Sequence, residues 1–90
     1  MDMIETSGSD RVARLREILA SQGRLVQPAS TLSIDDDLFS KGLDSLAIVN
    51  VMLAMEDAFG VELPDSMLNR RTFGSLAALD AAIASLKGVA

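Results

Sequence analysis

The segment that most constrains the fold is residues 45–59, SLAIVNVMLAMEDAF, which is apolar along most of its length. Asp44 and Ser45 are residue types that begin helices, and Gly60 is the type that ends them. No proline interrupts the run, so it predicts one continuous helix. Apolar residues recur at three- and four-residue spacing on one side, which predicts a core-facing stripe. The stripe consists of Ile48, Val51, Met52, Met55 and Phe59.

The same segment carries a second stripe that one buried face does not require. A helix that is apolar nearly all round is either enclosed by its own protein or contacts a partner. Full enclosure is difficult in a chain of 90 residues, which has room for one modest core. We therefore expect this second face to be a partner surface, with further core contacts as the alternative. The face consists of Leu46, Val49, Asn50, Leu53 and Asp57.

Helical patterns also occur on both sides of this segment. Residues 10–22 and 75–86 have apolar residues at helical spacing, with Gly23 as the expected end of the first and Ser75 as the start of the other. Residues 65–70 are expected to form a short helical turn after a proline. The predicted fold class is therefore all-α: a small four-helix bundle with three longer helices and one short helix.

The first and second helices are separated by an unusually long connection, residues 24–43. Pro28 and many polar residues argue against a continuous helix there. We expect a loop that is pinned by apolar side chains pointing inward. The predicted organisation is one domain at residues 9–88 that follows a flexible tail at residues 1–8.

Residue types that the chain lacks exclude several kinds of chemistry. It has no Cys and no His, which excludes disulfides, thiolate chemistry, His-dependent triads and His-ligated metals within the chain. The formal net charge of −5 argues against binding of nucleic acid, which depends on neutralising phosphates. No apolar run is long enough to span a membrane, and no signal-peptide pattern is present. We expect a cytoplasmic monomer that binds neither nucleic acid nor membranes.

Two charged clusters do not predict binding sites. The triplet Asp35–Asp37 lacks the alternating ligands, central glycine and distant glutamate of an EF-hand loop. A solvated acidic turn is the favoured interpretation, and no dedicated metal site is predicted. Arg70 and Arg71 form a basic patch of only two residues, which is interpreted as a solvated helix end.

Ser45, at the start of the central helix, admits three interpretations. It can cap the helix by accepting a hydrogen bond from a free backbone N–H group, as Asp44 also can. It can carry a phosphate-containing group, because a helix N-terminus offers free N–H donors and the positive end of the helix dipole. A role as a catalytic nucleophile fails, because no His can act as base and Lys41 is a poor substitute. The residues alone leave the cap and the modification site open.

Residues 37–65, DLFSKGLDSLAIVNVMLAMEDAFGVELPD, resemble the central segment of acyl carrier proteins and related carrier domains. The resemblance extends more loosely over residues 10–86. It rests on the combination of Asp-Leu, Gly-Leu-Asp-Ser-Leu, a helix with Glu56 and Phe59, and Val-Glu-Leu-Pro-Asp at a fixed distance. It implies a carrier that holds an acyl or aminoacyl group as a thioester on 4′-phosphopantetheine. Such a carrier is not itself an enzyme.

The resemblance also implies roles for individual residues. Ser45 would carry 4′-phosphopantetheine through a phosphodiester, and Asp44 would assist the modifying transferase by holding its metal ion. The implied partners are a phosphopantetheinyl transferase, an acyl- or aminoacyl-activating ligase and downstream acyltransferases. The residues implied to bind partner enzymes are Leu46, Val49, Leu53, Glu56 and Asp57.

The chain departs from fatty-acid carriers in two places. Those carriers usually place acidic residues early in the central helix, where this chain has Ala47 and Asn50, and residues 68–73, LNRRTF, are basic where theirs tend to be acidic. Both changes weaken docking to basic enzyme surfaces. LNRRTF is similar to specialised bacterial carriers, some of which accept amino acids from stand-alone ligases that resemble aminoacyl-tRNA synthetases. The alternatives are a carrier-like adaptor without the arm and a helical domain whose Ser45 is only a cap.

Overall fold

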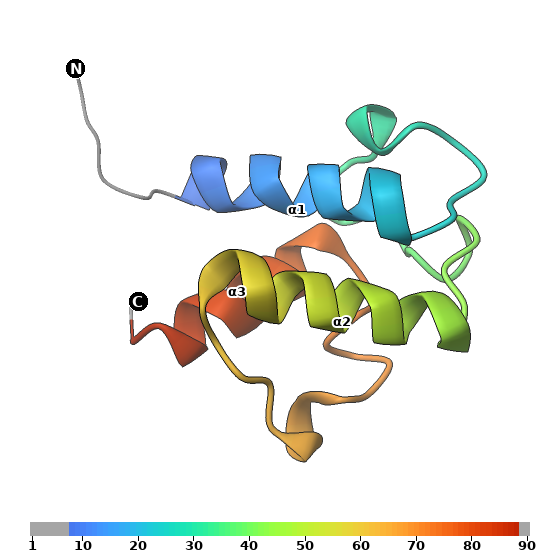
Figure 1. Ribbon diagram of the computed structural model, residues 1–90. Helices are drawn as coiled ribbons and strands as arrows, with labels where there is room; N and C mark the ends of the chain where they lie inside the picture. Colours follow the sequence, from blue (N-terminus) through green and yellow to red (C-terminus); the bar gives the residue numbers. More distant parts are fainter. Residues whose placement is uncertain (1–7, 89–90) are drawn as a thin grey trace.

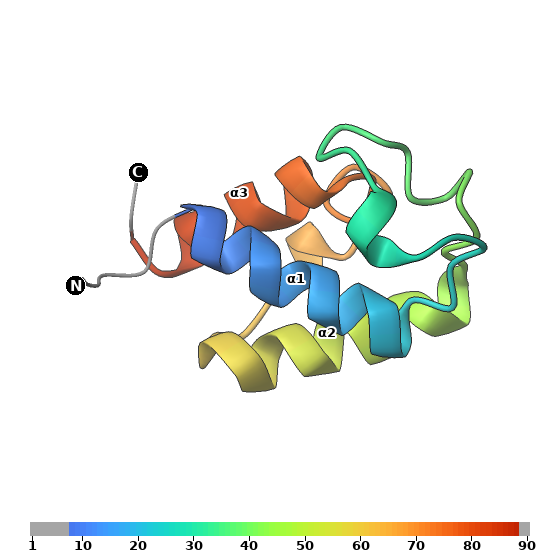
Figure 2. The same cartoon turned by 90° about the horizontal axis from the view of Figure 1, so that it is seen from above.

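In the computed structural model, residues 8–88 are described, and they form three α-helices and two short 3-10 helices. These are α1 (Gly8–Gln22), η1 (Ala29–Thr31), α2 (Ser45–Phe59), η2 (Asp65–Met67) and α3 (Leu76–Leu86). Helix α1 packs against both α2 and α3 (Figures 1 and 2). The described residues include no strand, and none of their helices is long and apolar enough to cross a membrane. The all-α class is confirmed.

The short fourth helix expected at residues 65–70 is not confirmed. Only η2, a single 3-10 turn, forms there, and Asn69 shapes the chain that follows it. The Asn69 side-chain amide donates to the Ser66 carbonyl at 2.8 Å, and its oxygen accepts the Thr72 N–H at 2.9 Å. Short polar side chains that bond to nearby backbone compete with helix formation. The described part of the chain is therefore a three-helix bundle with a structured loop before α3.

The core lies where the three helices meet, and one of its members was expected at the surface. Val51 and Met55 of the predicted stripe are fully buried, whereas Ile48, Met52 and Phe59 are only partly buried against the core. Ala47 is 0% exposed. The core face of α2 is therefore centred on positions 47, 51 and 55, which lie above one another on a helix. The expectation that Ala47 occupies a docking position is wrong.

Most of the predicted helix ends agree with the structure, and the end of α1 differs in detail. Helix α3 begins one residue after Ser75, whose hydroxyl accepts the Ala78 N–H at 3.0 Å. Gly23 packs so tightly against α1 that a Cβ atom there would lie 2.8 Å from the Leu19 carbonyl oxygen. The left-handed conformation is taken by the next residue, Arg24, with φ 55°. The expected tail lies outside the described residues except for Gly8, which begins α1.

The long connection between α1 and α2 is pinned from two sides. One guanidinium nitrogen of Arg16, Nη1, donates to the carbonyls of Ala29 and Leu32 at 2.9 and 2.7 Å. The Leu38 N–H donates to the Gly74 carbonyl at 2.9 Å, which ties the loop to the segment before α3. Its most deeply buried apolar side chains are Ala29, Leu32, Leu38 and Leu43. The predicted inward-pinned loop is confirmed for these side chains, whereas Val26 and Ile34, which were expected to point inward as well, are exposed. The loop leads the chain to the start of α2.

Candidate functional site

The turn before α2 brings the chain abruptly from the core to the surface. The Leu38 carbonyl accepts the N–H groups of both Lys41 and Leu43, at 3.1 and 3.0 Å. Leu43 is 3% exposed, so its side chain anchors the turn in the core. Asp44 and Ser45 follow it directly and are both exposed. The buried leucine therefore fixes the place at which the candidate site emerges.

Gly42 is required in this turn for two reasons. Its φ of 112° lies in a region that side chains other than glycine rarely adopt. A Cβ atom there would also lie 3.3 Å from the Arg24 carbonyl oxygen and from Val26. The Val26 N–H donates to the Lys41 carbonyl at 2.8 Å, which holds the two ends of the loop together. Glycine thus allows the loop to close tightly beside Ser45.

Asp44, rather than Ser45, caps α2. One carboxylate oxygen of Asp44, Oδ1, accepts the Ala47 N–H at 2.9 Å, and its backbone carbonyl accepts the Ile48 N–H at 2.9 Å. The backbone of Asp44 is extended, as expected for an N-cap residue. Of the two residues that could cap the helix, Asp44 fills that role and leaves the Ser45 side chain without it.

The Ser45 hydroxyl is exposed and makes no hydrogen bond with any residue in the described part of the chain. The first helical bond of α2 is donated by Ile48, so the N–H groups of Ser45 and Leu46 have no acceptor within the helix. An anionic group attached to this hydroxyl would meet free donors and the positive end of the helix dipole. The residues present therefore fit a phosphodiester-linked prosthetic group at Ser45.

The second face of α2 is exposed rather than buried. Leu46, Val49 and Leu53 are 61%, 48% and 54% exposed. Asn50 and Asp57 are exposed as well. Their exposure contradicts the alternative that this face makes further core contacts. An apolar face of this kind beside a modifiable hydroxyl is suited to contact a partner.

Glu56 differs from the other residues implied to bind partners, because its carboxylate is engaged within the chain. Its Oε2 atom accepts the Leu63 N–H at 2.8 Å, and its backbone carbonyl accepts the Val61 N–H at 3.2 Å. The side chain is half-buried. Glu56 therefore holds the connection between α2 and η2, a role that helical spacing could not indicate.

The acidic triplet Asp35–Asp37 forms a turn. Asp36 accepts the Ser33 N–H at 2.9 Å, and Asp37 accepts the Phe39 N–H at 3.0 Å. Within residues 8–88 no group of three Asp, Glu, His or Cys side chains is arranged to hold a metal ion. The carboxylates shape the loop by accepting backbone hydrogen bonds.

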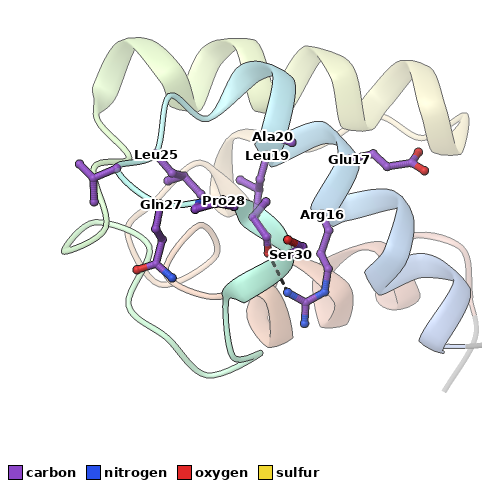
Figure 3. A pocket seen from close by; sticks show the side chains of 10 residues that line it. Arg16, Glu17, Leu19, Ala20, Leu25, Gln27, Pro28 and Ser30 are labelled. Carbon is purple, nitrogen blue, oxygen red and sulfur yellow. Dashed lines mark hydrogen bonds between the residues drawn. The ribbon is translucent and has the colours of Figure 1, made fainter.

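A groove of about 560 Å³ lies between α1 and the loop at residues 25–30 (Figure 3). Arg16 forms part of its wall, and its Nη1 atom is already bonded to two loop carbonyls. Val26, at 79% exposure, lies on the same loop and reaches towards Gly42. None of the predicted site residues lines this groove, so it is separate from the surface of α2.

Sequence patterns missed one contact beside the site. The Arg70 guanidinium lies over the Phe39 ring, with its central carbon 4.0 Å from the ring centroid. This cation–π contact joins the loop after η2 to the turn that precedes Ser45. The two residues are far apart in the sequence, so helical spacing carries no signal of it.

A three-helix bundle with an exposed serine hydroxyl that makes no hydrogen bond within the described residues, at a helix N-terminus, is compatible with a protein that carries a covalently attached group. The phosphopantetheine attachment site family matches residues 13–79, and this chain belongs to that family. It is therefore a carrier protein, which bears 4′-phosphopantetheine and holds an acyl or aminoacyl group on it as a thioester. The family resemblance is confirmed.

Two similar proteins are carriers of named kinds, one aminoacyl and one acyl. The aminoacyl carrier protein of Agrobacterium fabrum is 46% identical over 68 residues, which span 76% of this chain and 82% of that protein. The acyl carrier protein of Zymomonas mobilis is 36% identical over 67 residues, 69% of this chain and 78% of that protein.

Solved structures with a similar fold include a carrier protein. One is an engineered Bradyrhizobium japonicum glycine:[carrier protein] ligase complexed with AMP and a carrier protein from Agrobacterium tumefaciens. The matching chain is 43% identical, with a TM-score of 0.77 over 80% of this chain and 96% of that chain. The solution structure of an Agrobacterium tumefaciens protein matches with 40% identity and a TM-score of 0.70, over 86% of this chain and 93% of that chain.

Proposed function

We propose that this chain is an aminoacyl carrier protein whose 4′-phosphopantetheine arm is attached to the Ser45 hydroxyl. The observation that supports this attachment site is that Asp44 and Ser45 have different roles at the start of α2. Asp44 supplies the cap, and the exposed Ser45 hydroxyl has no partner in residues 8–88. Attachment there leaves the helix start intact, because no hydrogen bond of the fold has to be broken.

The arm, when bound, supplies the thiol that forms the thioester. The chain itself contains no Cys and therefore needs that thiol from the prosthetic group. The residues of the chain position the attachment site. Leu43 anchors the turn before it in the core, and Asp44 fixes the first turn of α2. In this proposal the chemistry belongs to partner enzymes and the carrier is not an enzyme, as its membership of a carrier protein family supports.

Asp44 has a second role in this proposal. Its Oδ1 atom is bonded to the Ala47 N–H, and the residue is exposed beside the Ser45 hydroxyl. The other carboxylate oxygen makes no hydrogen bond within the described residues. It is therefore free to bind the divalent cation of a phosphopantetheinyl transferase, for which carboxylate oxygens are preferred ligands.

The proposed cargo is an amino acid, loaded by a ligase that activates it. Two findings support this choice over a fatty acyl group: the similarity to an aminoacyl carrier protein, and the similarity to a carrier crystallised with a glycine ligase. The exposed face formed by Leu46, Val49 and Leu53 is the proposed contact for the ligase and for enzymes that remove the cargo, with Asn50 and Asp57 at its edge.

The attachment is tested by intact mass after incubation with a phosphopantetheinyl transferase and coenzyme A. The natural protein and the control Ser30→Ala, which alters another exposed serine, should each gain one phosphopantetheine. Ser45→Ala should gain none. Because Asp44 remains as the cap, Ser45→Ala should change the free energy of unfolding by less than about 0.5 kcal/mol. A Ser45→Ala protein that gains the full mass would refute the assignment.

The cargo is tested on the modified protein. Incubation with ATP, glycine and a glycine:[carrier protein] ligase should add the mass of one glycyl group, and hydroxylamine should release it as expected for a thioester. Loading by an acyl-activating ligase with no loading by amino-acid ligases would refute the aminoacyl assignment. Failure of the natural protein to gain an arm at all would instead favour an adaptor that acts only by protein–protein binding.

A further inference from the structure

We propose that the loop after η2 is a second contact for the aminoacyl ligase and that it binds an acidic patch on that enzyme. We call Leu68, Arg70 and Arg71 the basic loop. The proposal rests on the proposed function, because it concerns the enzyme that loads the arm. It adds a charged contact, from a different part of the chain, to the apolar face of α2.

The basic loop is held beside the attachment site. Arg70 stacks over Phe39, which lies six residues before Ser45 in the same turn. The Leu38 N–H bond to the Gly74 carbonyl joins the same two segments from the other side. Figure 1 shows the segment, in orange, below α2. The basic loop is therefore fixed to the turn that leads to Ser45.

Both arginines of this loop are exposed, and among the described residues only Arg70 makes a side-chain contact within the fold, its stacking on Phe39. Arg71 is exposed and makes no side-chain hydrogen bond or ion pair with a residue in the range 8–88. Leu68 is 42% exposed. Arg11 and Arg16 differ from Arg71, because Arg11 pairs with Asp80 and Arg16 bonds to loop carbonyls. Arg24 and Lys41 resemble Arg71, since their side chains make no hydrogen bond or ion pair within residues 8–88. An exposed leucine beside two exposed arginines has the composition of a contact surface with a polar rim.

The net charge of the chain and the charges near Ser45 indicate what kind of partner surface fits the basic loop. Two arginines are too few to hold a polyanion, and the net charge of −5 would repel one. On α2 there is no charged residue from Ser45 up to Glu56. The basic loop therefore supplies positive charge near this uncharged part of α2, in addition to Lys41 in the turn before Ser45. A protein surface with a few carboxylates around an apolar contact is complementary to it.

The test compares charge reversals that change the net charge equally. Arg71→Glu alters the basic loop, and Arg14→Glu is its control. The Arg14 side chain is 53% exposed and lies near Phe59, at the opposite end of α2 from Ser45. All proteins are first converted to the phosphopantetheine form and checked by mass. The measurement is kcat/KM for glycine transfer by the glycine:[carrier protein] ligase, at low and high ionic strength.

We expect Arg70→Glu with Arg71→Glu to lower kcat/KM about tenfold at low salt, since steering by charge changes association rates by tenfold or more. Arg71→Glu alone should lower it severalfold, and Arg14→Glu should stay within about twofold, as a distant screened charge should. About 0.5 M salt should remove most of the difference. Arg70→Lys, which keeps the charge and loses the planar stacking, should remain close to the natural protein.

Equal kcat/KM for Arg14→Glu and Arg71→Glu would refute the basic loop as a contact. A loss in Arg70→Lys as large as in the double variant would also refute it, because the loop would then act by positioning Phe39. In both cases the natural protein is loaded with glycine, so the proposed function stands. If the natural protein gains its arm but accepts no glycine, the aminoacyl assignment and this proposal are refuted together.

Discussion

Replacing Leu53 and Met55 separately by alanine tests whether the two faces of α2 have different functions. Leu53 is 54% exposed and Met55 is 0% exposed, although they lie on the same helix two residues apart. Truncation of a fully buried large side chain costs about 2–5 kcal/mol, because it leaves a cavity. Full burial of a leucine is worth about 1.5–3 kcal/mol, and less than half of Leu53 is covered. Leu53→Ala should therefore cost about 1 kcal/mol or less.

Thermal unfolding followed by circular dichroism separates these values. One kcal/mol corresponds to roughly 4–8 °C in the Tm of a domain of this size, so Met55→Ala should lower Tm at least about twice as much as Leu53→Ala. Glycine transfer should show the reverse order at a temperature where both proteins are folded. If Leu53 is a central docking contact, its truncation should cost about 1–2 kcal/mol, which is about a five- to thirtyfold loss of kcat/KM for Leu53→Ala. Equal losses of Tm, or unchanged transfer with Leu53→Ala, would refute the assignment of the two faces.

Two further predictions concern buried charge. Ala47→Asp should lower the free energy of unfolding by more than about 2 kcal/mol, since it places a carboxylate at a position with no exposure, whereas Asn50→Glu should change it by less than about 0.5 kcal/mol. Urea unfolding of both variants checks this, and equal midpoints would contradict the core position of Ala47. Asp80→Ala should cost about 2–4 kcal/mol, because it removes the partner 2.7 Å from the Arg11 guanidinium, whose side chain is 10% exposed. Glu17→Ala, which breaks an exposed ion pair, should cost less than about 0.5 kcal/mol, and similar losses for both would show that the Arg11 pair is solvated.

The helices that hold the site were predictable because each has local signals. Helix α2 begins after Asp44 and ends before Gly60, as expected from a capping carboxylate and a residue that adopts the left-handed conformation. The prediction of a short fourth helix failed because the Asn69 side chain bonds to the backbone on both sides of itself. Hydrophobic spacing gives no sign of such bonds. Ala47 was misplaced because alanine is tolerated on any side of a helix, and only packing shows which side it occupies.

The sequence indicated which residues to consider for the candidate site but not which hydrogen bonds each of them makes. The pattern Asp44-Ser45 allowed either residue to cap the helix, and the hydrogen bond to the Ala47 N–H decides between them. The resemblance to carrier proteins implied a partner-binding role for Glu56, and nothing in the sequence indicated that its carboxylate also bonds to the Leu63 N–H seven residues away. The stacking of Arg70 on Phe39 depends on the meeting of two loops. Contacts of this kind depend on tertiary structure, which local sequence patterns do not specify.

The start of α3 offers a contrast with the start of α2. The Ala77 N–H donates to the Ile34 carbonyl at 2.9 Å, and the Ser75 hydroxyl accepts the Ala78 N–H. The first turn of α3 is thus tied to the long loop, and it can open only when that loop also comes away from the bundle. The first turn of α2 has a cap but leaves the Ser45 N–H free. We therefore expect the first turn of α2 to open at a lower free-energy cost than the first turn of α3, which amide hydrogen exchange would measure.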